Sequence, residues 1–304
     1  MPLSSITKSI LFVPALATIT TPIASSQITQ TPSNSQEVTI TFNAKVADEP
    51  FACGESYPGL GTTDTTVTFN DFRFYVSDVA LIDAEGNLVP VKLEQDNKWQ
   101  YQNVALLDFE DKTGACANGT VETRNIVVGT VPQGEYRGLK FTLGVPYELN
   151  HEDAAIAPSP LNLTSMWWNW QGGYKFLRVD LENQATAMKN KQMKHGEMNH
   201  GNTSNQTFLI HIGSTGCQEM AEAYECNNPN RSDIVLENFD PENNVVVADL
   251  GNLLSQSDLT SNQPDTPAGC MSSPEDNDCM AIVHNLGLSF NNEASEGQTF
   301  FAVE

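Results

Sequence analysis

The chain has 304 residues, with 15 Lys or Arg against 38 Asp or Glu, so its formal net charge is −23 at pH 7. A surface this acidic repels the phosphates of nucleic acids, which excludes them as expected partners, and it attracts cations. The length suits one large domain or two small ones, and we expect a single domain.

The first 26 residues have the pattern of a secretory signal peptide. Lys8 precedes an uncharged apolar run over residues 10–23, and small residues follow at 24–26, where a signal peptidase could cut. The run contains two prolines and is too short to cross a bilayer easily. We therefore expect export, without stable membrane insertion of the mature chain.

Residues 27–36 are rich in Ser, Thr, Gln and Pro and are expected to form a flexible leader, so that the domain spans residues 37–304. Alternating runs with β-branched and aromatic residues then predict strands. These runs are Val38–Ala44, Val67–Leu81, Leu88–Leu93, Val104–Phe109, Ile126–Val131, Gly138–Val145, Tyr174–Leu181, Phe208–Ile212, Ile234–Leu236 and Asn244–Asp249. Helical patterns are few and short. The sequence therefore predicts an all-β, antiparallel β-sandwich with long loops and few short helices.

Six cysteines behind a signal peptide are expected to form disulfides that staple this fold. Several pairings are possible from sequence alone. Cys217–Cys226 and Cys270–Cys279 would each close a short loop, which favours local pairing and leaves Cys53–Cys116 as the third bond. The sequence contains neither a Cys-x-x-Cys motif nor a tight Cys/His cluster, so it does not indicate a zinc site.

One segment, residues 185–206, breaks the strand pattern and is expected to form a long exposed loop. It carries His195 and His200 together with the thioethers of Met193 and Met198. Imidazole suits Cu(II) and thioether sulfur suits Cu(I), so the tract points to weak capture of copper. The alternative is a polar linker whose methionines are incidental.

Two further histidines lie on separate predicted elements. His211 belongs to the strand Phe208–Ile212, on the face opposite to Ile210, and His151 lies in a loop that follows a strand. A lone histidine in such a place is more often structural than a ligand. Convergence of the two would reverse that judgement, and sequence spacing does not reveal it.

Three of the four tryptophans, Trp167, Trp168 and Trp170, fall within four positions. An extended backbone would place Trp168 and Trp170 on one face and Trp167 on the other. Such a cluster can fill a core, can form a stacking platform for a sugar, or can hold a redox-reactive indole close to a metal.

The sequence lacks a nucleophile elbow, a phosphate-binding loop, an HExxH motif and a dinucleotide fingerprint. We therefore expect a protein that is not an enzyme.

Long stretches of the chain resemble the MbnP-like family, also called the metallo-mystery pair four-Cys motif proteins. The matching stretches are Phe42–Val46, Phe51–Gly54, Asp71–Ser77, Leu106–Glu110, Phe141–Pro146, Asn150–His151, Pro158–Asn162, Trp168–Phe176 and His211–Cys217. The resemblance covers nearly all of the mature chain.

The resemblance implies a copper-homeostasis protein of the Gram-negative periplasm, with outer-membrane association or secretion as alternatives. It also implies a partner, a di-haem cytochrome c peroxidase-like enzyme of the MauG type that oxidises a tryptophan to kynurenine. Carried over by position, His151 and His211 are the leading copper ligands, with His284 as a weaker candidate. Trp168 and Trp170 are the candidates for oxidation.

Two rival functions remain compatible with the sequence. One is a copper-dependent oxidoreductase, which would need an open coordination position and access for a substrate. The other is a glycan- or ligand-binding module in which the tryptophans stack on the ligand.

Overall fold

The computed structural model describes residues 34–169, 171–183, 207–219 and 224–304. The predicted signal peptide, most of the leader and the whole His/Met-rich loop over residues 185–206 lie outside these residues. The described residues from 34 onward belong to one unit. Its first strand begins at Ser35, so the last two residues assigned to the leader form part of the fold. Within the described chain, no helix has both the length and the apolar character needed to cross a membrane.

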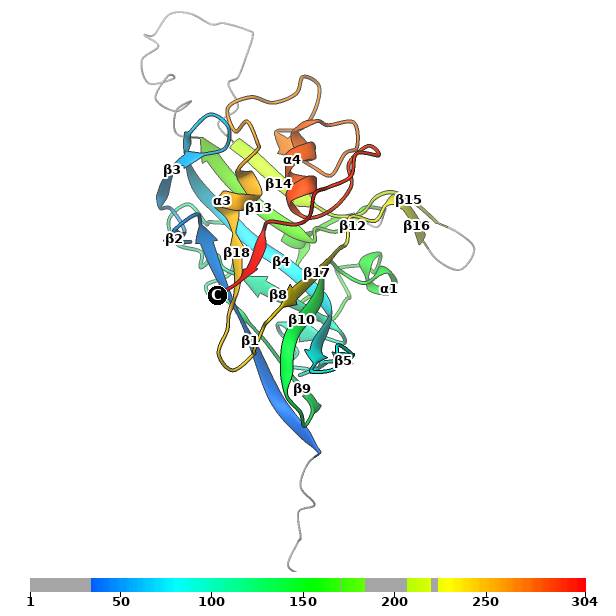
Figure 1. Cartoon of the computed structure of the whole chain (residues 1–304). Helices are drawn as coiled ribbons and strands as arrows, with labels where there is room; N and C mark the ends of the chain where they lie inside the picture. The colour runs from blue at the N-terminus through cyan, green and yellow to red at the C-terminus, as the bar shows by residue number, and fades with distance from the viewer. Residues whose placement is uncertain (1–33, 170, 184–206, 220–223) are drawn as a thin grey trace, which may run out of the picture. The chain divides into compact units, whose positions relative to one another are not determined.

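Two large sheets carry most of the chain (Figure 1). The first contains β1 (Ser35–Val46), β2 (Glu49–Pro50), β6 (Lys92–Leu93), β9 (Ile126–Pro132), β18 (Val246–Asp249) and β20 (Phe301–Val303). The second contains β3 (Ser56–Leu60), β4 (Thr65–Asp83), β5 (Leu88–Pro90), β7 (Gln100–Tyr101), β8 (Val104–Asp108), β10 (Tyr136–Leu143), β13 (Leu177–Asn183), β14 (Thr207–Ile212), β17 (Ser232–Glu237) and β19 (Gly269–Cys270).

The remaining elements are small. Two hairpins form separate sheets, β11 (Trp167–Asn169) with β12 (Gly173–Tyr174) and β15 (Thr215–Glu219) with β16 (Tyr224–Asn228). The helices are α1 (Tyr147–Asn150), the 3-10 turn η1 (Thr164–Met166), α3 (Leu250–Leu254) and α4 (Asp278–Asn285). Few and short helices are what the sequence predicts.

Aromatic side chains join the two large sheets into a sandwich. The ring of Phe42 on β1 lies 6.0 Å from that of Phe74 on β4 and 5.6 Å from that of Phe141 on β10, both edge to face. All three residues belong to one buried apolar cluster. Such pairs bury large apolar area with favourable quadrupole geometry. The predicted all-β sandwich is confirmed.

Two strand pairs are parallel, although the sequence predicts an antiparallel fold. β1 pairs with β18, and β14 pairs with β19, in parallel register. Each pair joins segments separated by long connections rather than by a tight turn. A tight hairpin forces antiparallel pairing, whereas a long connection leaves the direction open.

β4 is the central strand of the second sheet, and irregular pairing changes which of its residues face the sandwich core. Phe69 and Phe72 both belong to the core cluster, although strict alternation would place them on opposite faces. The register with β13 shifts between them, so that Asp71 pairs with Asp180 while Phe69 pairs with Leu181. A β-bulge of this kind inserts one residue and resets the alternation. As a result Asp71 and Arg73 point away from the core.

The face of the second sheet that points away from the sandwich core is covered by residues 145–176. A second buried apolar cluster forms there, and Tyr75 of β4 is one of its members. The Tyr75 and Tyr174 hydroxyls donate to the carbonyl oxygens of Pro160 and Leu161 at 3.0 and 2.6 Å. The covering segment is thereby fixed to the sheet, and the candidate site lies at its edge.

Candidate metal centre

His211 lies on β14, on the face of the second sheet that carries charged residues. Its Nε2 atom is 2.7 Å from Oδ1 of Asp180 on β13, and both residues are 7% exposed. Its neighbours Ile210 and Ile212 belong to the sandwich core. The alternation of residues 208–212 predicts a strand with His211 on the face opposite to Ile210, and the structure has this arrangement.

The charge state of this pair follows from its surroundings. Burial lowers the pKa of His211, and the hydrogen bond with Asp180 only partly offsets this effect. Burial opposes ionisation of Asp180, but hydrogen bonds from His211 and Arg178 outweigh it and lower its pKa to about 2. At neutral pH the imidazole is therefore neutral and donates its Nε2–H to a carboxylate. The lone pair then resides on Nδ1, as in histidines that bind metals through one nitrogen while a carboxylate holds the other.

Asp180 is itself part of a buried ionic network. Arg178 donates to Asp180 Oδ2 from its terminal nitrogen at 2.6 Å, and its Nε lies 3.1 Å from Asp71 Oδ2. Arg73 is fully buried and binds both carboxylate oxygens of Asp71. The Ser165 carbonyl accepts hydrogen bonds from Arg178 at 3.0 Å and from the ammonium group of Lys175 at 2.9 Å. His211 is thus held by a carboxylate whose network of charged residues lies on β4 and β13, and Arg178 links this network to η1.

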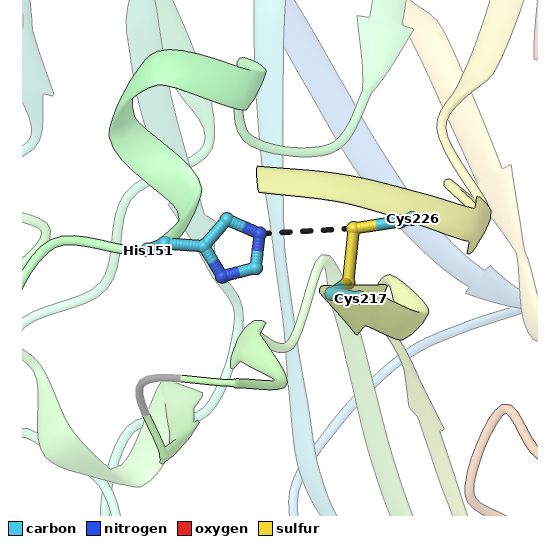
Figure 2. A group of neighbouring side chains, drawn as sticks. All are labelled: His151, Cys217 and Cys226. Atoms are coloured by element: carbon cyan, nitrogen blue, oxygen red, sulfur yellow. Dashed lines mark hydrogen bonds between the residues drawn. A yellow bond between two sulfur atoms is a disulfide. The ribbon is translucent and has the colours of Figure 1, made fainter. Parts of the chain in front are cut away.

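His151 directly follows α1 and is half-buried. The preceding residue fixes this turn, because the Asn150 side chain accepts a hydrogen bond from the Tyr174 backbone N–H at 3.0 Å. Gly173 approaches Asn150 closely, and a Cβ atom there would lie 2.3 Å from the Asn150 carbonyl oxygen. His151 Nε2 faces Cys226 at 3.7 Å (Figure 2).

Trp168 packs into a recess formed by two glycines. A Cβ atom on Gly172 would lie 3.2 Å from the indole, and a Cβ atom on Gly213 would lie 2.6 Å from it. Gly213 follows His211 by two residues and so points to the same face of the strand. Trp168 also lines an open cleft of about 570 Å³, together with Cys217 and Met271. The half-exposed indole of Trp168 is thus packed against Gly213, two residues after His211.

The other predicted ligands lie elsewhere. His284 is on α4, and its Nε2 is buried without a hydrogen-bond partner among the described residues. Trp167 packs against the second apolar cluster. Trp170 and the loop residues Met193, His195, Met198 and His200 lie outside the described residues.

The structure contains the disulfides Cys53–Cys116, Cys217–Cys226 and Cys270–Cys279, the pairs favoured by their spacing. Among the described His, Cys, Asp and Glu residues, one group of three could hold a metal by the proximity of its ligand atoms. It consists of His151, Cys217 and Cys226, whose ligand atoms lie within 4.8 Å of one another. His211 is not a member, so His151 and His211 occupy separate positions around the Trp168 segment.

The model of the family described as MbnP matches residues 35–272 of the chain. The chain belongs to the MbnP family. The solved structure of MbnP from Methylosinus trichosporium is similar, with 29% sequence identity and a TM-score of 0.73, and the match covers 88% of this chain and 98% of that one. No curated protein matches the chain.

The sequence predicts His151 and His211 as ligands, but it did not point to the residues that hold them in place. Asp180 and Asn150 were not singled out, nor were the glycines around the indole. One signal was present in the sequence: the alternating motifs Asp71-x-Arg73 and Arg178-x-Asp180 place opposite charges on one face of two strands. Charged residues in strands that are otherwise apolar predict a buried polar network.

The network also predicts a pH dependence of stability. Burial, with the nearby Glu110 carboxyl, raises the pKa of Asp108 to about 8, against the opposing effect of Arg73. Folded Asp108 is then neutral at pH 7, whereas in the unfolded chain it ionises near pH 4. Unfolding therefore releases a proton, and this contribution to stability is lost as pH rises from about 4 to about 8.

Asp108→Asn is expected to make the free energy of unfolding fall less steeply over this pH range, by up to about 1.4 kcal/mol per pH unit. Urea unfolding of both proteins at a series of pH values measures the difference. Glu110 and His211 titrate in both proteins and cancel in the comparison. If the free energy of unfolding falls equally steeply with pH in both proteins, the raised pKa of Asp108 is contradicted.

Proposed function

We propose that the chain is an exported copper-binding protein, with His151 and His211 as ligands, and that it is a substrate of a di-haem, MauG-type peroxidase rather than an enzyme. The observation that carries the proposal is the His211–Asp180 pair. A carboxylate holds one imidazole nitrogen and leaves the other for a metal, and Gly213, two residues further along the chain, forms part of the recess of Trp168.

The donor chemistry fits copper. Imidazole suits Cu(II) and Cu(I), and the thioether of Met271 lines the same cleft as Trp168. An indole offers no lone pair to a metal, whereas the aryl amine of kynurenine does. Bound copper would supply a soft cation held by nitrogen donors. The residues of this chain would orient the imidazoles and present a half-exposed indole to the partner.

The setting proposed for this function is the periplasm of a Gram-negative bacterium, where c-type haem partners mature. Three disulfides fit an oxidising compartment. They also engage every cysteine of the chain, which leaves copper to histidine, methionine and modified tryptophan in the oxidised protein.

Copper titration tests the ligand assignment. A His151→Ala, His211→Ala double variant is expected to lose the tightest site for Cu(I) and Cu(II), with affinity reduced by more than about 100-fold, because loss of even an outer-shell partner of a ligand costs about 10–100-fold. His284→Ala is the matched control and should bind normally. Retained affinity in the double variant would assign the binding to the loop with His195 and His200 instead.

Peptide mass spectrometry tests the modification. Co-expression with the peroxidase partner is expected to convert Trp168 or Trp170, with a net gain of oxygen and loss of the indole C2 carbon. Trp167→Phe serves as the control, because it alters the neighbouring indole and should leave the conversion intact. Unmodified Trp168 and Trp170 beside an active partner would overturn this part of the proposal.

The cleft favours one second candidate, a binding module in which Trp168 stacks on a glycan. Its volume of about 570 Å³ suits a small ligand, and aromatic faces commonly stack on sugars. Glycan binding that is unaffected by copper chelators and is lost in Trp168→Ala would favour this reading over the first.

A further inference from the structure

The Cys217–Cys226 disulfide differs from the other two in its exposure and in its neighbour. Cys270–Cys279 spans the same sequence separation of 9 residues, yet both of its cysteines are fully buried. Cys217 and Cys226 are half-buried, and Cys217 lines the open cleft. A reductant in solution therefore reaches this disulfide far more readily than its buried counterpart.

The β15–β16 hairpin would keep the two sulfurs together after the bond is broken. Cys217 lies directly opposite Cys226 in the antiparallel register, and Gln218 pairs with Glu225 beside them. Directly opposite residues hold their Cβ atoms about 4.5–5.5 Å apart through the backbone ladder alone. The third candidate ligand atom, His151 Nε2, lies 3.7 Å from Cys226 Sγ (Figure 2).

We propose that reduction of Cys217–Cys226 converts this cluster into a Cu(I) site whose ligands are Cys217, Cys226 and His151. Thiolates and imidazole are donors that select soft cations. Zinc favours four ligands, and the cluster offers three, while conditions that reduce a disulfide also keep copper in the Cu(I) state. The site shares His151 with the copper site proposed for the oxidised protein, replaces its other ligands by two thiolates, and depends on neither His211 nor tryptophan oxidation.

In the reduction step the reductant attacks Cys217 and the leaving group is Cys226. The thiolate of a dithiol reductant attacks Sγ of Cys217 from the cleft and forms a mixed disulfide, and the electron pair of the broken bond leaves on Cys226. This sulfur takes its proton from solvent, beside His151 Nε2, which accepts from the Asn150 side-chain amide at 3.3 Å and can in turn accept from the Cys226 thiol. The second thiol of the reductant then releases Cys217. Two electrons pass to the protein, the dithiol becomes a disulfide, and binding of Cu(I) displaces the protons from both thiols.

Selective reduction of the full mature protein tests the first half of the proposal. The protein is treated with increasing dithiothreitol, alkylated, and analysed by peptide mapping. Alkylation is expected at Cys217 and Cys226 while Cys270–Cys279, the loop of equal length, remains closed. Simultaneous opening of all three disulfides, or earlier opening of Cys270–Cys279, would overturn it.

Titration of the selectively reduced protein with Cu(I), buffered by bicinchoninate under anaerobic conditions, tests the second half. Reduced protein is expected to take Cu(I) at bicinchoninate concentrations at which oxidised protein does not, a gain in affinity. Cys217→Ser with Cys226→Ser should abolish the gain, as should alkylation of those thiols in the wild-type fold. His151→Ala should weaken it by at least about tenfold.

His211→Ala separates this inference from the proposed function, because it should impair the oxidised site and leave the gain on reduction unchanged. The absence of a gain, its persistence in the double serine variant, or tighter binding of Zn(II) than of Cu(I) would each overturn the proposal.

Discussion

Arg73→Met is expected to lower the free energy of unfolding by about 3–5 kcal/mol, the cost of breaking a buried ion pair by removal of one partner. Arg73 is fully buried, and its Nε donates to Asp71 Oδ1 at 2.8 Å and its terminal nitrogen to Ser165 Oγ at 3.1 Å. The variant leaves the buried Asp71 carboxylate with Arg178 as its remaining cationic partner. Urea unfolding with an unchanged m-value would report the loss.

Two comparisons make this prediction specific. Arg73→Met combined with Asp71→Leu should cost less than the single change, because no uncompensated charge is then left inside. Lys45→Met breaks the exposed pair with Glu304, which spans 2.7 Å, and should cost less than about 1 kcal/mol. If Arg73→Met lowers the free energy of unfolding no more than Lys45→Met does, the buried network contributes little to stability.

Gly213→Ala is expected to destabilise the fold by about 1–3 kcal/mol, the usual cost of overpacking, and to displace the Trp168 indole. The added Cβ would lie 2.4 Å from the Tyr174 carbonyl oxygen and 2.6 Å from the indole, so the backbone or the ring must move. The indole N–H resonance of Trp168 should shift in an NMR spectrum while that of Trp99 stays in place.

Gly134→Ala provides the matched control for this change. Its Cβ would meet the Tyr136 side chain at 3.6 Å, an ordinary contact, so stability and the indole resonances should be unaffected. If Gly213→Ala behaves in the same way, the recess is not what holds Trp168. If the indole moves, oxidation by the proposed peroxidase partner should fall as well.

Alternation of apolar residues was sufficient to predict most of the strands and the sandwich. The pattern Phe208–Ile212 correctly placed His211 on the face away from the core, because each residue in a strand points opposite to its neighbour. The β15–β16 hairpin was missed, because residues such as Gln218, Glu225 and Asn227 have low strand propensity. A disulfide and a ladder of backbone bonds stabilise that hairpin where side-chain preference does not.

The sequence predicts candidate residues for the site, and it does not contain their geometry. The family motifs pointed to His151 and His211, yet their separate positions depend on how residues 145–176 cross the sheet. The Asp180–His211 bond depends on the β13–β14 register, in which Arg178 lies opposite His211. Long-range register is set by the packing of the whole sheet, and a local sequence window does not contain it.

The pairing order of the first sheet constrains when the protein can fold. β1 lies between β9 and β18, and β18 in turn pairs with β20 at residues 301–303. The strand made first along the chain thus acquires its parallel neighbour about two hundred residues later. Such a topology has high contact order and slow closure, and it leaves β1 with an unpaired edge until the last segments arrive. A chain of this kind folds as a whole after synthesis rather than segment by segment, which is compatible with passage through a membrane in an unfolded state.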